Sequence, residues 1–330
     1  MRGLIFLVGV ALAAQSPKGW VKGKGYGWVY GKTDEIGALN AVLSPAQVAA
    51  ALKSVTTGQV YDLGVAVDRK SFKWPGHSAT EVMSYRSPAG VKSLKDMPGF
   101  GTGARGLAWH SCALFISDNV GTQIDGLGHI TRSVDNSWYN GYKEATDGDD
   151  FGVRKADADS IPPIVARAVL IDVAGWKNVD ALPGNYAIGP EDLQAALKAQ
   201  GADVVPGDIV MIRTGTLRYW GVNGADHSKI AAHDSAGINL EAAKWLVEQK
   251  GAVMIGSDTS GLEVGADPKR PGVVIPVHEY LLIEQGVHIG EFHNLEGLAR
   301  DKVYRFTYVA TTNRVKGAVA GFAMRPIAIR

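Results

Sequence analysis

Short apolar runs that alternate with helix-forming segments are the feature that most restricts the fold of this 330-residue chain. Three runs have the length and composition of buried strands: residues 168–173, 208–213 and 252–256. The segments between and after them begin with capping residues or end at a glycine: residues 190–200, 239–249 and 276–284. Strands that alternate with helices in this way indicate an α/β domain.

The rest of the chain is less regular. Ser44 and Pro45 form a favourable helix start, and several further runs are typical of strands: residues 60–65, 112–116, 304–310 and 319–324. We expect the run at 112–116 to be buried. Residues 70–106 are rich in Gly, Pro, Ser and Lys and show little periodicity, which predicts a long loop region. No repeat or convincing linker divides residues 15–330, so we interpret them as a single domain.

The N-terminus has the features of a secretory signal. Residues 1–14 combine a charged start, a short apolar core and the small-residue site Ala11-Leu12-Ala13. A buried N-terminal strand or an uncleaved anchor is the alternative. Removal of this segment predicts a periplasmic or secreted protein with no membrane association after cleavage. The single cysteine, Cys112, cannot form an intramolecular disulfide there, and its apolar run predicts a buried, inert thiol.

The charge balance argues against polyanionic partners. The chain has 34 Lys and Arg residues against 33 Asp and Glu residues, and they are scattered. We therefore expect no nucleic-acid partner. Residues 15–32 are rich in Gly, Lys and aromatic residues and predict an arm that packs over the body or over a partner subunit.

Polar side chains that can bind a metal gather in the segment 117–129, directly after the run at 112–116. If the backbone is extended, Gln123 and Asp125 share a face, because a strand has a periodicity of two. If it is helical after Asp125, then Asp125 and His129 share a face instead. Asn, Asp and Gly are also ordinary turn residues, so a short loop of this composition needs no function.

Two further metal-type ligands, His278 and Glu291, lie far along the chain. A catalytic metal needs donors from distant segments and one position left open for water. Nitrogen and oxygen donors of this kind suit zinc or manganese. Serine and thiol hydrolase schemes lack support, because the chain has neither a G-x-S-x-G turn nor a cysteine in a setting suited to a nucleophile.

The segment Asn119-x-Gly121-Thr122-Gln123-x-Asp125-x-x-x-His129 resembles the H-x-G-T-H-x-D-x-x-x-H motif of the metal-dependent cyclase family, which includes bacterial kynurenine formamidase and isatin hydrolase. Three later segments are similar to the family's P-G-D strand with its R-T-G turn, its I-G-x-D-T segment and its closing histidine-to-glutamate segment: residues 206–215, 255–259 and 278–295. Order and spacing agree over about residues 110–300.

This resemblance implies a swivelling β/β/α fold and hydrolysis of a C–N or C–O bond in a cyclic or acylated small molecule, such as a lactone, cyclic amide, imide or formamide. It implies that Asp125, His278 and Glu291 are ligands of a divalent metal, zinc or manganese, and that His129 is the general acid and base. It also suggests a homodimer or homotetramer.

The first two motif histidines are replaced here by Asn119 and Gln123. An amide oxygen binds zinc more weakly than an imidazole, so we expect one ion, held by Gln123, Asp125, His278 and Glu291. His129 becomes a ligand instead if the ion lies deeper. Four residues are candidates for supporting or substrate-contacting roles: Trp74, His77, Asn119 and Asp258. The alternatives to a hydrolase are a ligand-binding or inactive protein on the same fold, and a metal-dependent lyase or dehydratase.

Overall fold

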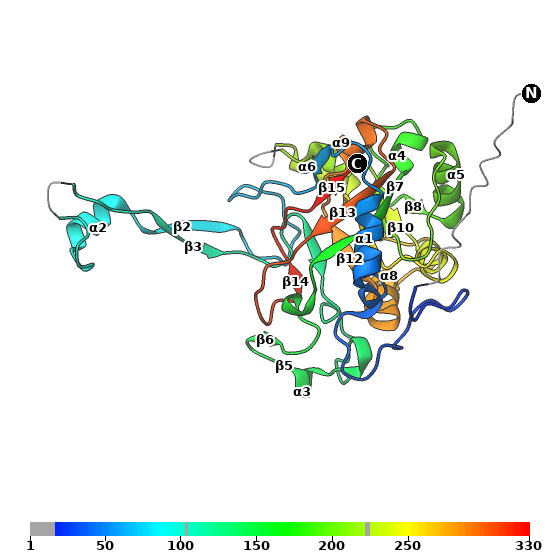
Figure 1. Cartoon of the computed structure of the whole chain (residues 1–330), viewed down its shortest axis with the longest axis horizontal. Helices are drawn as coiled ribbons and strands as arrows, with labels where there is room; N and C mark the ends of the chain where they lie inside the picture. Colours follow the sequence, from blue (N-terminus) through cyan, green and yellow to red (C-terminus); the bar gives the residue numbers. More distant parts are fainter. Residues whose placement is uncertain (1–16, 103–104, 222–224) are drawn as a thin grey trace, which may run out of the picture.

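A nine-stranded sheet forms the centre of the computed structural model, which describes residues 17–102, 105–221 and 225–330 (Figure 1). In spatial order, its strands are β1 (Val60–Asp62), β15 (Ile327–Ile329), β13 (Arg305–Ala310), β7 (Ile164–Asp172), β9 (Ile209–Arg213), β11 (Met254–Ser257), β12 (His288–Glu291), β4 (Gln123–Asp125) and β14 (Ala320–Gly321). The four central strands β7, β9, β11 and β12 are parallel, and their outer neighbours pair antiparallel.

The parallel strands are joined by helical crossovers, as the alternating pattern predicts. The crossovers contain α4 (Val173–Trp176), α5 (Pro190–Gln200), η4 (Thr216–Tyr219), α6 (His227–His233), α7 (Leu240–Lys244), η5 (Trp245–Gln249), α8 (Pro276–His278) and η6 (Glu279–Gln285). Local sequence fixes their ends: α5 has Pro190 in its first turn and ends at Gly201, whose φ of 61° lies in the left-handed region. The α/β class predicted from the sequence is confirmed.

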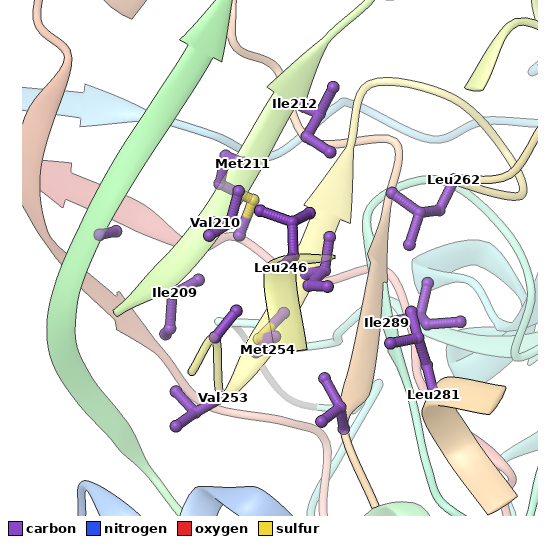
Figure 2. Close-up of a cluster of buried hydrophobic side chains, with 14 of the residues drawn as sticks. Ile209, Val210, Met211, Ile212, Leu246, Val253, Met254, Leu262, Leu281 and Ile289 are labelled. Carbon is purple, nitrogen blue, oxygen red and sulfur yellow. The ribbon is translucent and has the colours of Figure 1, made fainter. Parts of the chain in front are cut away.

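The core lies on both sides of the parallel strands. Every residue of β9 and of β11 is buried, which explains why their sequences are apolar without alternation. Figure 2 shows side chains of β9, including Ile209 and Ile212, beside Leu246 and the side chains of β11 and β12. This packed layer holds the carboxyl ends of β11 and β12 in place, and Glu291 lies at the end of β12.

Shorter elements surround this sheet. They are η1 (Gly37–Ala41), α1 (Pro45–Lys53), η2 (Tyr139–Gly141), α3 (Glu144–Asp147), β5 (Gly148–Asp149), β6 (Gly152–Val153), η3 (Ala158–Ser160), β8 (Ala187–Ile188), β10 (Gly237–Ile238) and α9 (Glu296–Arg300). The C-terminal run predicted as one strand at 319–324 contains only the two residues of β14, and β15 follows separately.

A two-stranded arm extends from the body (Figure 1). It is built from β2 (Glu81–Arg86), α2 (Pro88–Leu94) and β3 (Ser111–Phe115). The prediction of a long loop region over 70–106 was therefore wrong for residues 81–86 and 88–94, which form β2 and α2. The strand predicted at 112–116 exists, but its expected burial was wrong, and Cys112 is exposed. Both errors have one cause: the arm exposes apolar side chains on both faces, so it has no apolar-polar alternation.

The aromatic N-terminal segment packs over its own chain, one of the two possibilities predicted for it. The side chains of Trp20, Tyr26 and Trp28 donate hydrogen bonds of 2.7–2.8 Å to backbone carbonyls near η5 and η6. The predicted signal sequence, residues 1–14, lies outside the described residues. Among the residues that are described, no helix is both long and apolar enough to cross a bilayer.

Candidate metal centre

Strands β4 and β12 bring the two halves of the candidate site together. Their antiparallel register places Gln123 opposite Glu291 and Asp125 opposite Ile289. Because β4 is extended, the side chains of Gln123 and Asp125 lie on one face of the sheet. Residues 126–129 form a turn and no helix, so the helical alternative after Asp125 is excluded. The sheet therefore joins residues that are 168 positions apart in the sequence.

Asp125, His278 and Glu291 form a buried cluster whose potential ligand atoms all lie within 4.8 Å of one another. His278 Nε2 is 3.6 Å from Glu291 Oε1 and 4.0 Å from Asp125 Oδ2. These separations are too long for strong hydrogen bonds but suit three donors around one ion. The geometry brings together three of the four residues predicted as metal ligands, in the donor set of one nitrogen and two carboxylates.

Glu263 orients His278. Its carboxylate accepts hydrogen bonds of 3.1 Å from the backbone nitrogens of Val277 and His278, at the start of α8, and another from His278 Nδ1. This arrangement directs Nε2 toward Asp125 and Glu291. A carboxylate behind a metal-binding imidazole is a common supporting feature. Sequence reasoning missed Glu263, because it lies in a loop with no motif to distinguish it from a surface carboxylate.

The cluster concentrates negative charge in a buried place. Burial, together with the neighbouring Asp125, raises the pKa of Glu291 well above its usual range. Burial by itself would lower the pKa of His278, but the carboxylates of Glu263 and Glu291 outweigh it and raise this pKa to about 10. The site therefore retains protons that a divalent cation can displace.

Gln123 presents its amide nitrogen to the acidic groups. Nε2 donates hydrogen bonds to Glu291 Oε2 at 2.7 Å, Asn119 Oδ1 at 3.1 Å and Asp125 Oδ1 at 3.2 Å. Gln123 Oε1 and Asp125 Oδ2 are buried and have no hydrogen-bond partner among the described residues. Rotation of the side-chain amide group that exchanges Oε1 and Nε2 would direct Oε1 toward Asp125 and Glu291 instead.

His129 lies beside the cluster in the wall of a cavity of about 240 Å³. Its ring centre is 6.4 Å from that of His278, and its Nδ1 has no hydrogen-bond partner in the described part of the chain. His129 is half-buried, so its imidazole meets both the buried cluster and the cavity. The cavity is lined by most of the predicted site residues: Trp74, His77, Asn119, His129, His278 and Glu291.

Two aromatic groups shape this cavity from the segment that precedes the arm. Trp74 is fixed by its indole nitrogen, which donates to Asp234 Oδ2 at 2.6 Å and contacts the Ser260 hydroxyl. Burial, followed by the nearby His129, lowers the pKa of His77. A neutral imidazole and an indole thus form part of a pocket suited to a small organic molecule.

Asp258 has a different position from the other candidates. It is buried at the end of β11, and its carboxylate accepts hydrogen bonds from the backbone nitrogens of Thr214 at 2.8 Å and Gly215 at 2.7 Å. Burial raises its pKa to about 6. Asp258 fixes the turn after β9 and does not line the cavity.

Comparison with known proteins gives a consistent result. Residues 61–264 match the Cyclase family. A crystal structure described as a novel cyclase is 28% identical, covers 91% of this chain and 96% of its own, and has a TM-score of 0.76. Isatin hydrolase A from Labrenzia aggregata, bound to benzyl benzoate, is 18% identical, covers 86% and 97%, and has a TM-score of 0.57. The corresponding enzyme from Ralstonia solanacearum is 17% identical, covers 87% and 98%, and has a TM-score of 0.57. No curated protein matches the chain.

Proposed function

Because the chain belongs to the Cyclase family, we propose that it is a metal-dependent hydrolase that cleaves a C–N or C–O bond in a cyclic or acylated small molecule. Lactones, cyclic amides, imides and formamides are the substrate classes that fit the proposal. The observation that carries it is the convergence of Asp125, His278 and Glu291 from three separate segments onto one buried point beside a cavity.

The donor set fits a divalent ion. One imidazole nitrogen and two carboxylates are ligands of zinc and manganese, and Asp125 Oδ2 is a buried acceptor without a partner in the described chain. Glu263 would hold His278 with Nε2 directed inward. Gln123 would contribute its amide oxygen after a half-turn of the side chain. A divalent ion bound here supplies Lewis acidity, which acidifies water and polarises a carbonyl group.

His129 is the proposed general acid and base. It accepts a proton from attacking water at the mouth of the cluster and returns that proton to the leaving group, a role typically worth 10²–10⁴-fold in rate. Trp74 and His77 in the cavity wall would orient the substrate and exclude bulk water. Asn119, which accepts from Gln123 at 3.1 Å, would hold that amide in place.

A substrate panel tests this function. The purified protein should be assayed against a lactone, a cyclic imide and an N-formyl aromatic amine, first after treatment with a chelator and then after addition of Zn²⁺ or Mn²⁺. We expect hydrolysis of at least one class that chelation abolishes and metal restores. Binding of these compounds that is indifferent to chelation, without turnover, would support a ligand-binding protein instead.

We also propose that residues 1–14 direct export and are removed, so that the mature enzyme acts in the periplasm or outside the cell. The charged start, the apolar core and the small-residue site support this proposal. N-terminal sequencing of protein recovered from the exported fraction should begin near residue 14 or 15. An intact Met1 in that fraction would contradict cleavage.

A further inference from the structure

The cavity beside the metal cluster adjoins a second cavity of about 310 Å³. Most of the lining of this second cavity comes from the loop between β11 and α8. Among the described residues, five line both cavities: Trp74, Ser260, Gly261, Ile275 and His278. The two cavities therefore share a wall, and one of the proposed metal ligands, His278, belongs to that wall.

Trp74 is the largest side chain in the shared wall, and its position is fixed. Its indole nitrogen donates a hydrogen bond of 2.6 Å to Asp234 Oδ2, and its ring meets Phe72 edge to face with 5.6 Å between the ring centres. Asp234 is buried and also accepts hydrogen bonds from the backbone nitrogen of Ser260, at 2.9 Å, and from its hydroxyl. Trp74 is therefore held as a partition between the two cavities.

Ile275 contributes to the same wall in a strained backbone conformation. Its φ of 44° and ψ of 50° lie in the left-handed region, which a β-branched residue rarely adopts. The next residue is Pro276, and a proline favours an extended conformation in the residue before it. Strain of this kind is typical of ligand-binding sites. Here it accompanies a side chain that borders both cavities.

Apolar side chains form much of the second cavity: Val264, Val273, Val274, Ile275 and Pro276. Val273 and Val274 are 54% and 78% exposed, so water contacts them in the structure. A ligand group that fills the cavity covers this surface. Because removal of apolar surface from water is favourable, an apolar group gains most from binding here.

The carboxylates around the second cavity already have partners within the chain. Asp234 is hydrogen-bonded as described above, and Glu263 accepts from the start of α8. Asp267 accepts a hydrogen bond of 2.9 Å from a backbone nitrogen, and its other oxygen lies 3.7 Å from Arg270 Nε. These pairings leave the apolar side chains to determine which ligand group the cavity binds.

We propose that the second cavity is a subsite for an apolar substituent of the substrate, an aryl ring or a branched alkyl group attached next to the reacting carbonyl. The inference rests on the proposed function. His278 borders both cavities, so a carbonyl at the metal cluster has the second cavity directly beside it. The volume of about 310 Å³ has room for an aryl ring, since an apolar cavity of about 150 Å³ binds benzene. Substituted lactones, cyclic amides and imides are therefore preferred to the parent rings.

Binding of cyclic ketones tests the subsite separately from catalysis, because a ketone has no acyl C–N or C–O single bond to cleave. Cyclopentanone and α-phenylcyclopentanone are titrated calorimetrically into the protein loaded with Zn²⁺. We expect the phenyl compound to bind about tenfold or more tightly, because its ring is removed from water. Equal affinities, or no binding of either compound, would overturn the subsite. Tighter binding of the para-aminomethyl derivative of the phenyl compound would overturn its apolar character.

Val273→Asp tests the apolar lining. Val273 is exposed and lines the second cavity but not the first, so its charged replacement disturbs neither the core nor the metal cluster. The preference for the phenyl compound over cyclopentanone should fall by about fivefold or more, because the ring then displaces water from a charge. Val179→Asp, at an exposed position outside both cavities, is the matched control. An unchanged preference in the Val273 variant would overturn the location of the subsite.

Trp74→Leu tests the shared wall through a gain of affinity, which damage to the fold does not produce. A smaller side chain widens the passage between the cavities. Relative to the phenyl compound, α-naphthylcyclopentanone should bind the variant about threefold or more tightly than it binds the wild type. Trp176→Leu is the control, since Trp176 is exposed and lines neither cavity. Proportional loss of both compounds in a variant that circular dichroism shows to be folded would overturn the role of Trp74 as a partition.

Hydrolysis of γ-butyrolactone and α-phenyl-γ-butyrolactone is measured on the same preparations. A preference for the phenyl ketone without hydrolysis of either lactone would support the subsite and contradict the hydrolase function. Hydrolysis of both lactones with equal kcat/KM, together with equal ketone affinities, would support the hydrolase function and overturn the subsite. We expect the phenyl lactone to have the higher kcat/KM in the wild type and to lose this advantage in Val273→Asp.

Discussion

Gln123 lies directly opposite Glu291 across the β4–β12 pair, and its amide nitrogen donates a hydrogen bond of 2.7 Å to Glu291 Oε2. The motif that this segment resembles has a histidine at the position of Gln123. Relative to that motif, Gln123 offers an amide, which is either a donor or a weak acceptor, where an imidazole would be a strong nitrogen ligand. The proposed site is therefore built mainly from Asp125, His278 and Glu291.

The first prediction concerns Gln123. Gln123→His should raise the affinity for Zn²⁺ by about tenfold or more, because an imidazole is a better zinc donor than an amide. Turnover need not rise, since stronger donation makes the ion a weaker Lewis acid. Isothermal titration measures the affinity, and Gln59→His, on an exposed loop, is the control. Weaker zinc binding in the Gln123 variant would count against this position as a ligand.

Glu263 gives the second prediction. Glu263→Gln should lower metal affinity by roughly 10–100-fold, because the neutral amide is a poorer partner for His278 Nδ1 and for the start of α8. The fold should persist, so thermal unfolding is measured alongside the metal titration. Glu284→Gln, a half-exposed carboxylate on η6, serves as the control. Unchanged affinity in the Glu263 variant would show that His278 needs no carboxylate behind it.

His129 gives the third prediction. His129→Ala should keep the metal and lower kcat by about two to four orders of magnitude, because the proton acceptor is lost while the ligands remain. Metal analysis and steady-state kinetics on the same preparation separate the two effects, with His110→Ala on the exposed arm as the control. Loss of metal together with activity would make His129 a ligand, and unchanged activity would remove it from the chemistry.

The fourth prediction concerns pH and stability. Burial raises the pKa of Asp258 to about 6 from an ordinary value of 3.8, so the folded state holds this proton more tightly than the unfolded state. The stability that this group contributes is fully present below pH 3.8 and is lost as pH rises through about 6.

Urea unfolding of the wild type and of Asp258→Asn from pH 4 to pH 7 measures this effect. The free energy of unfolding of the wild type should fall by roughly 2 kcal/mol relative to that of the variant over that range. The amide of the variant does not titrate. The contributions of all other ionisable groups to the free energy of unfolding therefore cancel in the difference between the two proteins. A difference that is constant with pH, or that grows in favour of the wild type as pH rises, would contradict the raised pKa.

The strands of the core were predictable because a strand that is buried on both faces has an apolar sequence without alternation. β9, β11 and the second half of β7 are mainly apolar without alternation, and Gly201 marks the end of α5 through its left-handed conformation. The positions of Asp125, His278 and Glu291 were predictable from motif order. Their convergence depends on the register between β4 and β12, which no local pattern encodes.

The features that sequence reasoning missed depend on contacts between distant segments or on the exposure of apolar side chains. Glu263 acts only because its loop passes the start of α8, 14 residues further along the chain. Sequence reasoning did not identify the arm, because its exposed apolar residues lack the alternation that identifies a half-buried strand. Cys112 was expected in the core for the same reason, since an exposed apolar run resembles one in a core.

Anomalous diffraction from crystals grown with Zn²⁺ or Mn²⁺ tests the central claim most directly. The account predicts one strong peak per chain, about 2.0–2.2 Å from His278 Nε2 and from an oxygen of both Asp125 and Glu291. The peak should be absent in Asp125→Asn crystals grown in the same way. A wild-type map with no peak between these three residues, or with its only strong peak elsewhere, would contradict the metal centre.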